Sequence, residues 1–169
     1  YVIGRKYKVF IYKIKKKIRN KVFETNSSSV HSLVISSEGL EPSNLKIDPK
    51  TDHIIVNTQY FGKEYNIYST QEDKLSYLIT YIVVDLQNKY DDDEILTVEL
   101  FKDYRFIDIE NIIKEYCNCS GVIVNIDEEG GFDHQTSPHE SGCIIDFYNN
   151  QEVKNFIFNK YISLKTTWD

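Results

Sequence analysis

Residues 71–90 have the sequence QEDKLSYLITYIVVDLQNKY, which contains the clearest secondary-structure signal in the chain. Its apolar residues recur at helical spacing and predict one buried stripe, formed by Leu75, Leu78, Ile79, Ile82, Val83 and Leu86. Thr70 followed by Asp73 resembles a capping box, in which each side chain bonds the backbone N–H of the other residue. The stretch therefore predicts an amphipathic helix that begins after Thr70.

Weaker signals on both sides of this helix predict the other elements. Short apolar runs predict strands at residues 32–36, 53–57, 60–68, 95–101, 122–126 and 143–147. A second stripe predicts a helix that ends before Asn118, and a third predicts a helix over 151–161 with Val153, Phe156, Ile157 and Tyr161 inward. The acidic run 91–94 predicts a solvated loop, and the last two strands are expected to pair across the polar loop 127–142. The fold class predicted is α+β, a single domain with a mostly antiparallel central sheet and about three helices.

Charge divides the chain into two parts. Residues 1–21 contain nine of the 20 basic residues and no acid, so the rest of the chain has 11 basic against 26 acidic residues. We expect a basic N-terminal extension or arm at 1–21 and one domain at 22–169. The arm is either a solvated tail or a segment that contacts phosphates or acids. A main body with a net charge of −15 excludes a general nucleic-acid binder built on a basic body.

Membrane and export signals are missing from the sequence. No segment has the roughly 18 continuous apolar residues of a spanning helix, and the apolar stretch 9–12 is too short for a signal peptide. The three cysteines, Cys117, Cys119 and Cys143, form an odd and sparse set that is typical of reduced thiols. These features predict a protein of the cytosol with no membrane partner.

The first candidate functional segment is the serine-rich run at residues 23–32. Its Asn and Ser side chains favour a tight turn, and successive backbone N–H groups in such a turn form a concave anion site. His31 enters the following strand, where an imidazole near several hydroxyls suits acid–base work or phosphate contact. The predicted ligand-binding residues are Asn26, Ser27, Ser28, Ser29 and Ser32, with His31 catalytic. The alternative is a plain turn followed by a half-buried, hydrogen-bonded histidine.

The second candidate segment is the polar loop at residues 128–142. It is much longer than a usual hairpin connection, and long loops on a rigid sheet often carry binding groups. His134 and Asp133 are the predicted catalytic pair, and Gln135 and Thr136 are the predicted ligand-binding residues. Gly130 and Gly131 would let the backbone approach a ligand. The alternative is a mobile polar loop without a ligand.

Metal, nucleophile and cofactor patterns are weaker. His134, His139 and Cys143 lack standard zinc spacing, so no metal ligand is predicted. The serines of residues 27–29 with a His and Asp133 have the inventory of a nucleophile triad, but they lack the Gly-x-Ser-x-Gly elbow. A glycine-rich phosphate loop is also missing, and the sequence identifies no cofactor.

The run from Phe23 to Ser32, FETNSSSVHS, resembles the opening of a group of phage and prophage proteins from low-GC Gram-positive bacteria. Those proteins tend to carry an Asp-His-Gln-Ser-like string in their second half, which matches residues 133–136 here with Thr136 in place of Ser. The resemblance implies that the two strings form one site and that the natural start lies near Arg19 or Lys21. It implies no particular activity.

Together the two segments predict a phage accessory protein with a pocket for an anionic small molecule, a nucleotide or a nucleotide-derived signal. The serine turn would hold phosphate, His31 and His134 would exchange protons, Asp133 would tune one of them, and Gln135 would bind a base or sugar. Hydrolysis or group transfer is the enzymatic form, and the sequence leaves turnover open. Two other classes stay open: a non-catalytic anti-defence protein that sequesters a signalling nucleotide or binds a host defence protein, and a minor structural protein of a virion. Each is compatible with a homo-oligomer.

Overall fold

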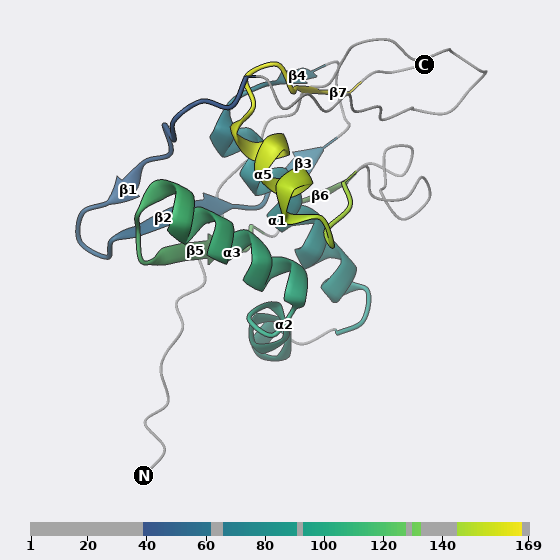
Figure 1. Ribbon diagram of the computed structural model, residues 1–169. Coiled ribbons are helices and arrows are strands. Elements are labelled where there is room, and N and C mark those ends of the chain that lie inside the picture. Colours follow the sequence, from purple (N-terminus) through teal and green to yellow (C-terminus); the bar gives the residue numbers. More distant parts are fainter. Residues whose placement is uncertain (1–38, 62–65, 91–92, 128–129, 133–144, 167–169) are drawn as a thin grey trace, which may run out of the picture.

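The computed structural model describes residues 39–61, 66–90, 93–127, 130–132 and 145–166 (Figure 1). In chain order the elements are β1 (Ile47–Asp48), β2 (His53–Asn57), β3 (Tyr60–Phe61), β4 (Asn66–Tyr68), α1 (Gln71–Gln87), α2 (Asp93–Leu100), α3 (Tyr104–Cys117), β5 (Gly121–Asn125), β6 (Gly131–Phe132), α5 (Asn150–Phe158) and β7 (Leu164–Thr166). This mixture of helices and small sheets confirms the predicted α+β class. None of the described helices is long and apolar enough to cross a bilayer.

The predicted mostly antiparallel sheet is wrong. The three-stranded sheet has the order β1-β2-β5, in which β1–β2 is antiparallel and β2–β5 is parallel. β3–β6 is a further parallel pair, and β4–β7 is antiparallel. The prediction failed because it paired β5 with residues 143–147 across a loop. β5 instead returns to β2 after α1, α2 and α3, and a crossover of this length permits parallel pairing. In the described part of the 143–147 stretch, residues 145–147 form a bend and turn.

α1 is the centre of the molecule and begins as predicted. The Thr70 side chain accepts from the Asp73 N–H at 3.0 Å and the Asp73 carboxylate accepts from the Thr70 N–H at 3.2 Å, which completes the capping box. The predicted stripe is buried, but so are polar residues on the other sides of the helix, including Ser76 and Thr80. In Figure 1, α3 and α5 lie in front of α1, and the β1–β2–β5 sheet lies to the left.

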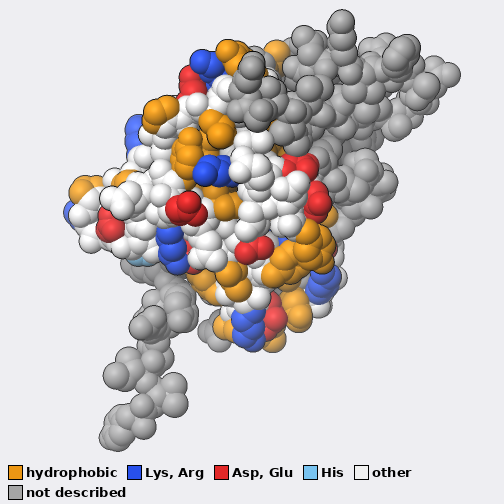
Figure 2. Space-filling view, in the orientation of Figure 1, with side chains coloured by type: hydrophobic (Ala, Val, Ile, Leu, Met, Phe, Trp, Pro, Cys, Tyr) orange, Lys and Arg blue, Asp and Glu red, His pale blue; other side chains and the backbone are white. Residues whose placement is uncertain are grey.

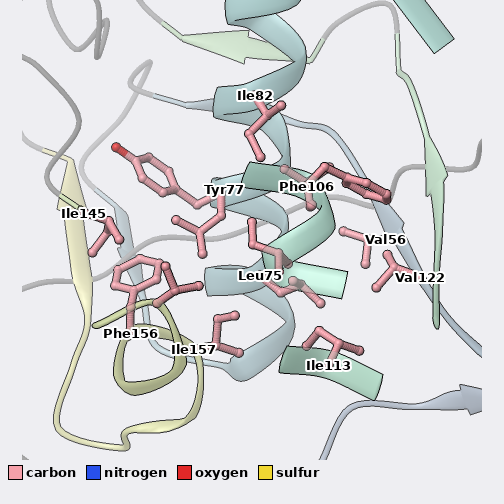
Figure 3. Close-up of a cluster of buried hydrophobic side chains, with 14 of the residues drawn as sticks. Val56, Leu75, Tyr77, Ile82, Phe106, Ile113, Val122, Ile145, Phe156 and Ile157 are labelled. Carbon is pink, nitrogen blue, oxygen red and sulfur yellow. The ribbon is translucent and has the colours of Figure 1, made fainter. Parts of the chain in front are cut away.

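Side chains from several elements meet around α1. Figure 3 shows Leu75 between the strand residues Val56 and Val122 on one side and Phe156 and Ile157 of α5 on the other. The stripe analysis missed Tyr77, which is fully buried and whose ring lies edge-on to Phe61 and Phe132, with centroids 5.4 and 5.5 Å away. α1 therefore carries core on more than one face.

The other two predicted helices are present. α3 ends at Cys117, and Asn118 closes it in the left-handed conformation, φ 52°, as a C-terminal cap. α5 buries Val153, Phe156 and Ile157 as predicted. Tyr161, predicted to face inward, lies beyond the end of α5 and is 64% exposed. The helical period stops at Phe158, so Tyr161 does not continue the stripe.

The strand predicted at residues 95–101 is wrong, because this stretch belongs to α2. This run of mixed apolar and polar residues fits either element, and the pattern of buried residues shows a helical period. Leu96 and Leu100 are buried four residues apart, whereas Ile95 and Val98 are about half exposed. The end of the acidic run, predicted as a loop, enters the first turn of α2.

The core contains the charged side chain of a lysine. Lys74 of α1 is 1% exposed, and its Nζ donates to the carbonyl oxygens of Asn159 at 2.7 Å and Ile162 at 3.3 Å. Burial lowers the pKa of Lys74 to about 8, against the opposing effect of Asp73 and Glu41. These two hydrogen bonds therefore hold the turn after α5 against α1.

The free energy of unfolding of the native chain should rise relative to that of Lys74→Met by about 1.5 kcal/mol between pH 8 and pH 9.5. The folded lysine loses its proton from about pH 8, whereas the unfolded lysine keeps it to near 10.5. The unfolded state thus binds more protons in this window, and stability rises with pH. Urea unfolding at several pH values measures the difference. Lys89→Met, at a side chain that is 55% exposed, is the control for removing a lysine near the end of α1 without opening the core. A flat or falling difference contradicts the account.

Candidate functional site

The site residues predicted from sequence lie outside the described residues. They are Asn26, Ser27, Ser28, Ser29, His31, Ser32, Asp133, His134, Gln135 and Thr136. The structure describes the place where the second group begins, since β6 ends at Phe132 and Asp133 follows directly. It also describes an aromatic cleft that the sequence analysis did not identify.

The first region is the carboxyl end of the parallel strands. Two residues separate β2 from β3, whereas five residues separate β5 from β6. The register of the β3–β6 pair is therefore shifted by three residues relative to that of the β2–β5 pair. Asn57 and Asn125 pair at the last step of β2–β5, and the Asn125 Nδ2 donates to the Asn57 Oδ1 at 2.7 Å. The Thr58 N–H donates to the Asn125 carbonyl at 3.1 Å. Neutral amide groups therefore line the end of this ladder.

Thr58 and Gly130 hold the bulge between β5 and β6. The Thr58 Oγ1 accepts from the Asp127 N–H at 2.8 Å and lies 3.3 Å from the Asp127 carbonyl oxygen. A Cβ on Gly130 would lie 2.2 Å from the Thr58 Oγ1, so only glycine fits. Close packing on Thr58 is thus a sufficient reason for glycine at position 130, while a Cβ on Gly131 would meet nothing within 4 Å. The approach of a ligand to these glycines stays a prediction.

Gln59 contributes an unusual polar group to the same region. The residue is 7% exposed, and its side-chain Nε2 has no hydrogen-bond partner among the described residues. Its own carbonyl accepts from the Gly131 N–H at 2.9 Å, so it lies beside the strand that leads into Asp133. A buried amide donor without an acceptor costs about 1–3 kcal/mol, and native proteins contain few of them.

The second region is an open cleft of about 500 Å³ between α1, α3 and the segment before α5. Its lining residues are Tyr81, Tyr104, Arg105, Ile145, Asp146, Phe147, Tyr148 and Glu152. They come from distant parts of the sequence and from no shared motif. Sequence patterns therefore gave no signal for this cleft.

Arg105 belongs to the lining of the cleft and joins α3 to α1. Its Nη2 donates to the Asp85 and Asp103 carboxylates, each at 2.7 Å, and its Nε donates to Asp103 at 2.9 Å. Asp103 is also the N-cap of α3 and accepts from the Arg105 N–H at 2.9 Å. Burial would raise the pKa of Asp85, but hydrogen bonds from Lys89 and Arg105 outweigh it and hold this pKa below its ordinary value. Burial would lower the pKa of Arg105, but its hydrogen bonds to Asp103 and Asp85 raise it.

These ion pairs decide which ligand the cleft suits. The guanidinium charge of Arg105 is matched by two carboxylates at its own position, and Asp146 and Glu152 add further negative charge. An anion would meet no unpaired cation in the lining. The cleft is thus different in kind from the anion pocket predicted from sequence.

Metal-binding groups are not gathered in the described part of the chain, where no three His, Cys, Asp or Glu side chains are arranged to hold an ion. Cys117 and Cys119 are free thiols. The Cys117 thiol donates to the Ser43 Oγ at 3.1 Å, and burial raises the pKa of Cys117. His134, His139 and Cys143 lie outside the described residues.

Comparison of the chain with protein-family models, with curated proteins and with solved structures finds no match. The resemblance of residues 23–32 and 133–136 to phage and prophage proteins therefore stays a prediction.

Arg105→Met should lower the free energy of unfolding by about 3 kcal/mol at pH 7, because it removes the buried cation shared by two partly buried carboxylates and leaves Asp85 only the exposed Lys89. The pKa of Asp85 is lowered in the folded protein, so its pairing stabilises above about pH 4, and this contribution disappears as pH falls further. The loss caused by the substitution should therefore shrink below pH 4.

Lys89→Met is the matched control for Arg105→Met. Lys89 also bonds Asp85, at 2.8 Å, but its side chain is 55% exposed, so its loss should cost about 0.5 kcal/mol or less. Urea unfolding of the three proteins at pH 7 and pH 3.5 gives the comparison. Equal costs for the two substitutions would contradict the structural role given to Arg105.

Proposed function

We propose that this protein binds an anionic small molecule, a nucleotide or a nucleotide-derived signal, at the carboxyl end of its parallel strands. In this proposal the serine-rich segment 26–29 supplies N–H and hydroxyl donors to phosphate. His31 and His134 serve as phosphate donors or acid–base partners, with Asp133 beside His134. Gln135 and Thr136 contact the base or sugar. The resemblance of both segments to phage and prophage proteins is the ground for proposing a phage accessory protein.

The end of β6, directly before Asp133, supports this site. Ligands of parallel sheets bind beyond the carboxyl ends of the strands, because loops diverge there and leave room between them. β2, β5, β3 and β6 all run toward the region from which residue 133 departs. The amide groups of Asn57 and Asn125 at this end suit hydrogen bonding to a polar ligand.

The observation that carries the proposal is the buried Gln59 amide. Its Nε2 is a donor without an acceptor among the described residues, next to the strand that leads into Asp133. A ligand oxygen would satisfy it, and the cost of leaving the donor unpaired in the free protein would then be recovered on binding. Phosphate, ribose and base carbonyl oxygens are all suitable acceptors.

The full chain purified from its host cell should release a nucleotide or nucleotide-like anion, close to one per chain, when it is denatured by heat. Mass spectrometry identifies the released molecule, and a thermal shift with the same molecule confirms binding. Recovery of the molecule intact after prolonged incubation indicates sequestration, and its conversion indicates turnover. The release of no small molecule, together with no thermal shift from nucleoside mono-, di- and triphosphates, would falsify the proposal.

Gln59→Leu should weaken binding at least tenfold while leaving the free energy of unfolding unchanged or higher, since leucine removes the buried unpaired donor. His134→Ala should also lose binding or turnover without a change in melting temperature. His53→Ala is the control, because His53 lies at the opposite, amino end of β2. Binding of equal strength in the native, Gln59→Leu and His134→Ala proteins contradicts the proposed location.

A further inference from the structure

The aromatic cleft over Arg105 presents side chains that a stable monomer usually covers. Tyr104 and Tyr148 stack with centroids 4.9 Å apart and an interplanar angle of 17°, yet they are 42% and 82% exposed. Behind them, Tyr81 and Phe147 stack at 5.6 Å. Figure 2 shows hydrophobic side chains gathered beside acidic ones on this face of the molecule. Paired, exposed tyrosines are typical of surfaces that receive another chain segment.

The carboxylates of the cleft retain capacity to bind a cation. Asp146 uses its Oδ1 to accept from the Tyr148 N–H at 2.9 Å, and Glu152 uses its Oε1 to accept from the Asp146 N–H at 3.2 Å. No described residue bonds the second oxygen of either carboxylate. These bonds hold both acids in place beside the tyrosine pair, with one oxygen each left over.

This combination defines the chemistry of the occupant. The Arg105 guanidinium is already bound by Asp85 and Asp103, so the open charges of the lining are negative. Aromatic faces attract ammonium and guanidinium groups, and the alkyl stems of Lys and Arg pack on aromatic rings. The cleft therefore suits a lysine- or arginine-rich segment with some apolar residues.

The chain itself contains such a segment. Residues 5–21 hold nine basic residues and no acid, and hydrophobic residues are interleaved with them, namely Tyr7, Val9, Phe10, Ile11, Tyr12, Ile14 and Ile18. Residues 22–38 connect it to the described part of the chain, and at about 3.3 Å per residue they span up to roughly 55 Å. A folded body of this size is only about 40 Å across, so the connection reaches any face of it. Tethering also gives the segment an effective concentration on the order of millimolar.

We propose that the aromatic, acidic cleft of Tyr81, Tyr104, Asp146, Phe147, Tyr148 and Glu152 binds the basic segment 5–21 of the same chain. Lysine or arginine side chains lie against the tyrosine pair and bond the second oxygens of Asp146 and Glu152. Docking covers the exposed tyrosines and offsets part of the negative charge of the main body.

Carbodiimide coupling of the full chain tests this contact, because it joins a lysine amine to a carboxylate only when the two touch. Peptide mapping should find lysines of segment 5–21 joined to Asp146 or Glu152. A mixture of ¹⁵N-labelled and unlabelled chains should give these links within one chain, light to light and heavy to heavy. The yield should fall several-fold between about 0.05 and 0.5 M NaCl, as expected for screened charges.

Three variants separate a specific cleft from general attraction. Glu152→Gln combined with Asp146→Asn removes both carboxylates, so the couplings to these positions are lost. Light scattering and gel filtration should then show a larger hydrodynamic radius, because the basic segment is released from the cleft. Tyr148→Ala keeps both carboxylates but should lower their coupling yield at least threefold. Glu115→Gln, which removes one exposed acid at the far end of α3, should change nothing at the cleft. Unfolding curves of each variant show whether the fold is intact.

Two outcomes overturn the proposal. In the first, the basic segment couples to exposed acids throughout the body without preference, and Tyr148→Ala has no effect, which means that attraction is nonspecific. In the second, the couplings to Asp146 and Glu152 join only labelled to unlabelled chains, which means that the occupant is the segment of a second copy. Both readouts are measured on the chain freed of small molecules, so this proposal can succeed or fail whatever the nucleotide-release experiment finds.

Discussion

The burial of α1 on nearly all of its sides is the constraint on which the rest of the structure depends. A helix with one apolar stripe needs one covering layer, whereas α1 contacts the β2 strand, the α2, α3 and α5 helices and the β6 strand. The buried lysine of α1, Lys74, donates hydrogen bonds to two carbonyl oxygens of the turn after α5. Because burial of an unpaired ammonium is costly, the path of the chain from Asn159 to Ile162 is coupled to the placement of α1.

Local periodicity predicted the elements, but pairing between distant elements lay beyond it. α1, α5, β2 and β5 were expected within a few residues of their bounds, and α3 was expected to end before Asn118, since each carries a helical period or a short apolar run. The parallel pairing of β2 with β5 joins residues 68 positions apart, such as Asn57 and Asn125, and nothing local marks that choice. The strand predicted at residues 95–101 failed for a different reason. This run of mixed apolar and polar residues fits both the helical and the strand period, and the burial of Leu96 and Leu100 decides for the helix.

The candidate sites show the same division between local and distant information. A string such as Asn-Ser-Ser-Ser-x-His is visible in sequence because its donors are neighbours. The aromatic cleft combines Tyr81, Arg105 and Tyr148, which are dozens of residues apart and are brought together only by the packing of α1, α3 and the segment before α5. Gly130 also shows that residue type alone leaves the cause open: the close approach of Thr58 requires a glycine there whether or not a ligand binds.

Charge connects the two proposals. A body with 11 basic and 26 acidic residues repels anions at long range, so an anion site on it must depend on short-range donors. Backbone N–H groups, Ser hydroxyls and Asn or Gln amides are donors of this kind, because they bind phosphate without net charge. The positive charge of residues 5–21 could assist such a site only when the segment is not held elsewhere. A cleft that holds Lys and Arg side chains against Tyr104 and Tyr148 thus competes with the anion site for the same basic segment, and an anionic ligand would weaken docking to the extent that it attracts that segment.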